Sequence, residues 1–163
     1  MDTGVHTNSH QSAAVHHAPA TLARWQHAVQ RARAAQQTGQ WRMATAYQHQ
    51  ALALSLRLLE HTPPPGREDD CVAAVVVSHL NVADLQVQAG AVDDATQILC
   101  RAHAVLLGLM ADARHGAGLQ QAAWRHSRET HAALLRHVQA HGAHPSVTQA
   151  LASAHLAHGP GPH

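Results

Sequence analysis

Two glycines that break helices, Gly39 and Gly90, stand 51 residues apart, and their matching surroundings restrict the fold more than any other feature. An alanine lies seven residues before each glycine, and others lie five and twelve residues after it. The six positions are Ala32, Ala44, Ala51, Ala83, Ala95 and Ala102. Paired helices need small side chains where their axes come closest, and large ones, such as Trp41 and Val92, just past the turn. The pattern predicts a helical hairpin that occurs twice.

Apolar residues recur at three- and four-residue steps through most of the chain, as in amphipathic helices. Helix-ending signals separate these segments: Gly39, the prolines of "HTPPPG", Gly90, Gly116 and the break before Pro145. Acidic residues open the third and fourth segments, where they suit the positive end of a helix dipole. No run alternates apolar and polar residues convincingly, so no strand is predicted. We expect helices over about 21–38, 40–60, 67–89, 93–115, 117–141 and 145–158.

The composition agrees with an all-α fold. Hydrophobic residues make up 45% of the chain, with no Phe, three Trp and one Tyr. The core must therefore be built from Leu, Val and Ala, which pack well between helices. We predict one helical domain over residues 20–158. A disordered tail at 1–19, polar and rich in histidine, is expected before it, and a frayed C-terminus at 159–163 after it.

Charge and hydropathy argue against several classes of protein. The net charge is +1 with histidine neutral, and the eleven arginines form no stripe, so nucleic-acid binding is not predicted. The longest apolar runs, "CVAAVVV" and "AVLLGLMA", are too short to span a bilayer, and no signal peptide is visible. Cys71 and Cys100 fall in expected helices and are interpreted as reduced, buried thiols. A cytoplasmic protein is expected.

Eighteen histidines raise the question of metal binding. The best candidate ligands are His137 and His141, four residues apart on one helix face, with His144 just beyond, and the pair Cys100 and His103. The histidines are otherwise scattered, and no Cys-x-x-Cys occurs. We predict no metal site and no cofactor, while a His-rich metal-binding helical protein remains the alternative.

Catalytic arrangements are equally hard to find. The segment "SHLNVAD" brings Ser78, His79, Asn81 and Asp84 together in sequence, but its spacing assembles no nucleophile with its base. No glycine-rich phosphate loop occurs. We interpret the four residues as helix-surface positions and predict no catalytic residue, and therefore a protein that is not an enzyme.

The stretches "GQWRMATAYQHQALAL" and "HLNVADLQVQAGAVDDATQILCRAH" resemble tetratricopeptide repeats (TPRs), in which a helix, a glycine turn and a second helix carry small residues at these intervals. The likeness covers residues 21–60 and 70–104. In a weaker third unit Ala150 and Ala157 keep the seven-residue interval after Val147, with Pro145 in place of the glycine. The repeat is longer than the usual ~34 residues, and "HTPPPGRE" is an insertion. The resemblance implies antiparallel hairpins stacked as a short TPR-like array of two clear repeats and one degenerate repeat.

This resemblance also implies a function, because stacked hairpins offer an extended concave face to a protein or peptide partner. The first helix of each hairpin lines that face in the family. Matching positions give Gln26, Val29, Arg33, Gln36, Val77, Leu80, Asp84 and Val87, extended by Leu135 and Gln139. Arg33 and Asp84 are equivalent positions and are expected on one face, either open to a ligand or paired with each other. A homo-oligomer whose groove is filled by its own copy is a further alternative.

Overall fold

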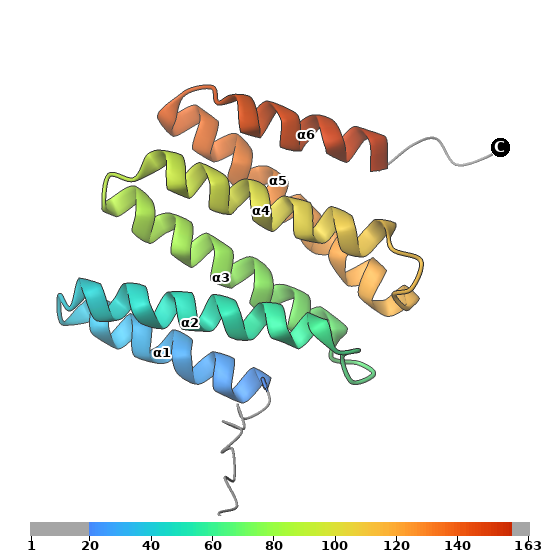
Figure 1. Cartoon of the computed structure of the whole chain (residues 1–163), viewed down its shortest axis with the longest axis horizontal. Coiled ribbons are helices and arrows are strands. Elements are labelled where there is room, and N and C mark those ends of the chain that lie inside the picture. The colour runs from blue at the N-terminus through green and yellow to red at the C-terminus, as the bar shows by residue number, and fades with distance from the viewer. Residues whose placement is uncertain (1–19, 158–163) are drawn as a thin grey trace, which may run out of the picture.

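The computed structural model describes residues 20–157, and these form six α-helices with no strand (Figure 1). The helices are α1 (Leu22–Gln37), α2 (Trp41–Glu60), α3 (Glu68–Gln88), α4 (Val92–Ala111), α5 (Ala117–His141) and α6 (Pro145–Ala157). The all-α prediction is confirmed. The predicted tail at 1–19 and the predicted C-terminus at 159–163 lie outside the described residues.

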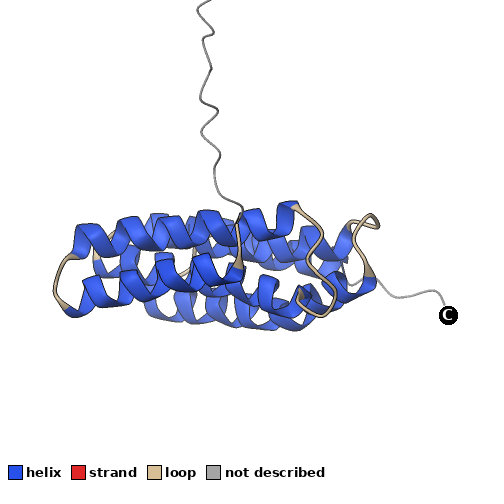
Figure 2. Cartoon of the chain, turned by 90° about the horizontal axis from the view of Figure 1, so that it is seen from below, coloured by secondary structure: helices blue, strands red, loops and turns tan. Residues whose placement is uncertain are grey.

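The helices stack in chain order, and each contacts the next along the chain. Helix α3 also contacts α1 and α5, and α4 contacts α6, so helices two apart in sequence lie side by side. Figure 2 shows that the helix axes are nearly parallel to one another, with the connecting loops at the two ends of the stack. Because α3 touches four other helices, it is the central element of the stack.

The turns at Gly39 and Gly90 are alike in detail. Both glycines have positive φ, 71° and 77°, a conformation that favours glycine because it has no Cβ. Each turn is closed by two backbone hydrogen bonds with the same spacing: the glycine N–H donates three residues back, and the following N–H donates five residues back. This pair of hydrogen bonds is the Schellman motif, which satisfies carbonyl groups at a helix C-terminus. The sequence signal for both hairpin turns was therefore correct.

All six alanines of the repeated pattern are buried, and none is more than 2% exposed. Ala83 and Ala95 belong to one core cluster with Leu99 and Leu134, whereas Ala51 packs with α1 in another. The expected role of Trp41 was wrong, because its side chain is 55% exposed and lies beside the α1–α2 turn instead of filling the space between helices. Buried Gln48 and Leu52 occupy that side of α2 instead.

Helix α4 ends at Ala111, four residues before the predicted end at His115. The reason is local. The Asp112 carboxylate accepts the backbone N–H of Arg114 at 2.9 Å and its guanidinium at 2.7 Å, which folds the chain into a turn. These bonds hold the pKa of Asp112 well below its usual range.

The two cysteine thiols differ in burial. Cys71 is buried as predicted, whereas Cys100 is only half-buried.

By length and composition alone, α3 could cross a membrane, although the longest unbroken apolar runs in the sequence are short. More than half of its most apolar window is buried inside the protein. Val72, Val76 and Ala83 belong to the two clusters that α3 forms with α4 and α5. Its apolar residues therefore serve the core of the stack.

Candidate functional site

The eight predicted partner-binding residues lie on two neighbouring helices. Gln26, Val29, Arg33 and Gln36 are on α1, and Val77, Leu80, Asp84 and Val87 are on α3. Helices α1 and α3 contact each other, and α5 contacts the far side of α3, so the three form a continuous surface. We call the side of these helices that carries the eight predicted residues, with its expected extension at Leu135 and Gln139 of α5, the α1–α3–α5 face.

These eight residues differ in how available they are. Gln26, Arg33 and Asp84 are exposed, and the other five are half-buried. Among the half-buried residues, Val29 packs on the α1–α2 cluster, and Leu80 and Val87 pack on the α3–α5 cluster. The apolar members therefore contribute to the edge of the core, and the polar members reach solvent.

Charges alternate across the α1–α3–α5 face. On α3, Asp69 accepts a 2.7 Å bond from Arg125 of α5, and this bond lowers the pKa of Asp69. Partial burial raises the pKa of Asp84, and the charge of Arg136 on α5 opposes that rise. Arg33 makes no ion pair with Asp84. Two acids of α3, Asp69 and Asp84, thus interact with arginines of α5, whereas α1 contributes Arg33 to the face.

The extension of this surface onto α5 is exposed. Leu135 is 43% exposed, and Gln139 is also exposed. Trp124 lies about three turns before Leu135, with its ring against the guanidinium of Arg128 at 4.5 Å. An exposed tryptophan stacked by arginine is a frequent anchor in protein interfaces. The sequence analysis did not select Trp124, although its large aromatic side chain at an outward helix position was a usable signal.

The four polar residues of "SHLNVAD" point to different neighbours. Ser78 accepts a 2.8 Å bond from the Trp25 indole, and the His79 Nδ1–H donates to the Val75 carbonyl at 2.8 Å. Asn81 lies 3.5 Å from the Gln48 amide, and Asp84 interacts electrostatically with Arg136 of α5. Ser78 and His79 are fully buried, so the interpretation of all four as helix-surface positions was wrong for these two, whose side chains bond inside the stack.

Two buried Thr–His pairs join α4 to α5. Thr96 of α4 lies 2.8 Å from the His137 ring of α5, and Thr130 of α5 lies 2.8 Å from the His103 ring of α4. Each threonine also donates to a carbonyl of its own helix, so the hydroxyl must accept from the histidine N–H. The sequence analysis missed this arrangement, whose signal is the spacing Thr-x6-His, which occurs once in each helix.

Burial lowers the pKa of two core histidines, His137 and His79. Desolvation lowers the pKa of His137, and the nearby His141 and His144 lower it further. Burial also lowers the pKa of His79, with a smaller contribution from Arg101, and the hydrogen bond to Val75 opposes both. The Nε2 atom of His79 is buried without a hydrogen-bond partner. These rings act as polar core residues.

Two of the candidate metal ligands, His137 and His103, are hydrogen-bonded to threonines. His137 is bonded to Thr96, and its ring lies 4.7 Å from that of His141. His103 is bonded to Thr130, and Cys100, on the preceding turn of α4, is half-buried. Within residues 20–157 no group of three or more His, Cys, Asp or Glu side chains is arranged to hold a metal ion.

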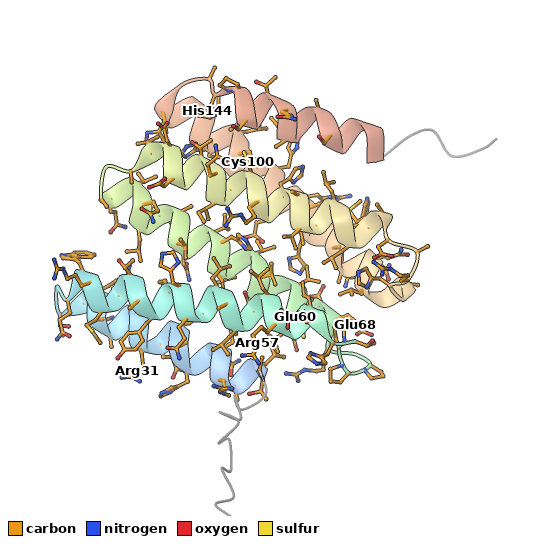
Figure 3. The ribbon with its side chains drawn as sticks, viewed as in Figure 1. Arg31, Arg57, Glu60, Glu68, Cys100 and His144 are labelled. Carbon is orange, nitrogen blue, oxygen red and sulfur yellow. The ribbon has the colours of Figure 1, made fainter. Side chains whose placement is uncertain are left out.

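Several hollows lie at the surface of the stack, away from the buried Thr–His pairs. One of about 150 Å³ lies between the α2–α3 and α4–α5 loops, where the Glu68 side chain rests on Gly118. A second, of about 240 Å³, lies between Trp41 and the end of α3. Two more, of about 370 and 310 Å³, follow the groove between α1 and α2. Figure 3 shows Arg31 and Arg57 along this α1–α2 edge, and Glu60 and Glu68 at the loop.

Comparison with known proteins gives one match. No curated protein and no solved structure matches the chain significantly. A family model, described as a protein of unknown function (DUF2753), matches residues 23–159, a range that includes all of α2 to α6 and nearly all of α1. Because this match covers most of the 163 residues, the chain belongs to the DUF2753 family.

Proposed function

We propose that this protein is a TPR-like scaffold, without enzymatic activity, that binds a protein or peptide on its α1–α3–α5 face. The observation that carries the proposal is the likeness of the first two hairpins. They share the same glycine turn and bury alanines at the same three positions, which supports the proposal that they are two copies of one unit. Successive copies of a helical hairpin present their first helices on a common surface, which is where repeat proteins bind partners.

The side chains on this face suit a polypeptide ligand. Exposed Gln26 and Arg33 on α1 and Asp84 on α3 offer donors and acceptors of both charges, and exposed Leu135 and Trp124 on α5 offer apolar area. Such a mixture is typical of protein interfaces. The near-neutral chain gives no electrostatic basis for binding nucleic acid, and both cysteines are free thiols, which suits a cytoplasmic location.

The test is capture of a partner by matched variants. The untagged chain, coupled to beads, is incubated with extract of its native cells, and captured proteins are identified by mass spectrometry. We expect Arg33→Ala and Asp84→Ala to reduce a captured protein by at least about fivefold, since each removes a charge from the face. Arg42→Ala, an exposed arginine at the start of α2, is the control and should leave capture unchanged.

Thermal midpoints of all three variants should stay close to that of the unmodified chain, because each replaced side chain is exposed. If Arg33→Ala and Asp84→Ala capture as much as Arg42→Ala does, the partner does not bind on the α1–α3–α5 face. The proposal would then have to be abandoned.

A further inference from the structure

The outer face of the first hairpin, opposite the side that meets α3, is a long groove between α1 and α2. Its two hollows, of about 370 and 310 Å³, share Arg31 on their rim. Small or apolar residues form the floor: Ala28 and Leu54 in one hollow and Ala35 in the other, all buried. We call this surface, lined by α1 and α2 away from α3, the end groove.

The second hairpin shows what such a face normally contacts. Adding the 51-residue interval to the outward positions of α1 gives four positions on α3, all of them buried. Arg24, His27, Arg31 and Ala34 correspond to Val75, Ser78, Val82 and Leu85. That face of α3 packs against the first hairpin, where Ser78 meets Trp25 of α1 and Leu85 lies beside Trp41 of α2. The end groove is therefore shaped like a helix-packing face, and no described helix covers it.

Its chemistry differs from that of α3 in one respect, which is charge. Val75, Ser78 and Val82 are replaced by Arg24, His27 and Arg31, all exposed along one stripe of α1. Among residues 20–157 no carboxylate lines either hollow. Arg31 is held in place over the Tyr47 ring, with its carbon 4.3 Å from the ring centre and a hydrogen bond to the hydroxyl. The groove thus combines an apolar floor with a fixed basic rim.

We propose that the end groove is a docking site for an acidic amphipathic helix of a partner protein, which lies along α1 as α2 lies along α3. The apolar side of such a helix would contact Ala28 and Leu54, and its flanking carboxylates would meet Arg24 and Arg31. This surface is separate from the α1–α3–α5 face and does not depend on the function proposed for it. Arg31 and Arg33 are two residues apart, so they point to opposite sides of α1.

The charges of the chain itself argue against two other occupants. Residues 1–19 contain a single acid, Asp2, and four histidines, so this segment lacks the charge that the rim would attract. In a symmetric pair of end grooves, Arg24, His27 and Arg31 would face their own copies, which is unfavourable. An acidic helix from another protein satisfies both the shape and the charge.

The probe is a synthetic peptide of about 18 residues, long enough to form about five helical turns, with a leucine stripe flanked by glutamates. A second peptide carries lysine in place of every glutamate. Binding of each fluorescein-labelled peptide to the full chain is followed by anisotropy. We expect the glutamate peptide to bind, the lysine peptide not to bind, and ~0.5 M salt to weaken the complex by screening.

The variants locate the peptide. Arg31→Glu and His27→Glu should each weaken binding of the glutamate peptide by about tenfold, whereas Arg33→Glu, on the other side of α1, should change it by less than about twofold. Circular dichroism checks that each variant stays folded.

Three results would overturn the proposal. The first is no binding of the glutamate peptide at ~1 mM, which corresponds to less than about 4 kcal/mol. The second is an equal loss of affinity for the glutamate peptide in Arg33→Glu and Arg31→Glu. That result would place the peptide on the α1–α3–α5 face and support only the function proposed for that face. The third is a large gain in affinity when residues 1–18 are removed, which would mean that this segment competes for the groove.

Discussion

Alanine determines how closely the helices of this protein can approach. Where α3 meets α4 and α5, Ala83, Ala95 and Ala133 share a cluster with Leu99 and Leu134, so each small side chain leaves room for a neighbouring leucine. A larger residue at such a point has no space, because protein interiors are packed as densely as organic crystals. Single positions therefore control the separation of whole helices.

Replacing Ala83 with leucine should lower the free energy of unfolding by about 1–3 kcal/mol through over-packing. Urea unfolding followed by circular dichroism measures the loss. Ala53→Leu is the matched control, since Ala53 is exposed on α2 and its replacement should change stability by less than about 0.5 kcal/mol. Equal midpoints for the two variants would contradict the packing described here.

Two glycines should respond to the same substitution with opposite signs. Gly90 has φ of 77° in the turn between α3 and α4, so Gly90→Ala forces a strained backbone and should cost about 1 kcal/mol. Gly108 lies inside α4, and an added Cβ would meet nothing within 4 Å, so Gly108→Ala should gain about 0.5–1 kcal/mol. Thermal melts of both variants test this, and a stabilised Gly90→Ala would show that the turn is not required.

At the scale of the element, the α4–α5 pair stands out because histidines cross its interior. His103 and His137 each donate to a threonine on the opposite helix, and both rings are buried. Buried polar groups must be paired, since an unpaired one costs about 1–3 kcal/mol. The α4–α5 contact therefore depends on hydrogen bonds as well as on apolar area.

Acid should weaken the fold through buried histidine. Burial lowers the pKa of His79 and His137 below the ordinary 6.5, so the unfolded chain binds protons first as the pH falls. Stability is full above pH 6.5 and declines as the pH falls from there toward the folded-state pKa, by at most ~1.4 kcal/mol per pH unit for each histidine. Urea unfolding at pH 7.5 and at pH 5.5 measures the decline.

His137→Gln should reduce this pH dependence, because glutamine keeps an N–H donor for Thr96 but does not titrate. His49→Gln, at an exposed position of α2, is the control and should leave the pH dependence as it was. If His137→Gln and the unmodified chain lose the same stability between the two pH values, His137 is not one of the groups responsible.

At the scale of the whole molecule, local signals predicted most of the fold. Gly39 and Gly90 end helices through their own backbone conformation, and Pro145 begins one, so the sequence was sufficient to locate those boundaries. The end of α4 was missed because the turn at Asp112 depends on a side-chain bond to Arg114, which competes with continued helix.

Features that involve two distant segments were harder to predict. His103 is hydrogen-bonded to Thr130, and Asp84 interacts electrostatically with Arg136, and neither partner is near in sequence. The exposure of Trp41 follows from its place at the first residue of α2, beside the turn, whereas Gln48 and Leu52, about two and three turns further along the same side of the helix, are buried. The candidate surface on α1 and α3 could be predicted from the repeat, whereas the charge contributed by α5 could not.

The two Thr–His hydrogen bonds also restrict the register of α4 against α5. Thr96 and His103 are seven residues apart, as are Thr130 and His137, so a seven-residue slip keeps the same sides facing. A slip in one direction sets Thr96 against Thr130 and leaves His103 against Ala123. A slip in the other sets His103 against His137 and leaves Thr130 against Met110. Only the native alignment gives both His103 and His137 an acceptor, so these two bonds specify the register of α4 against α5.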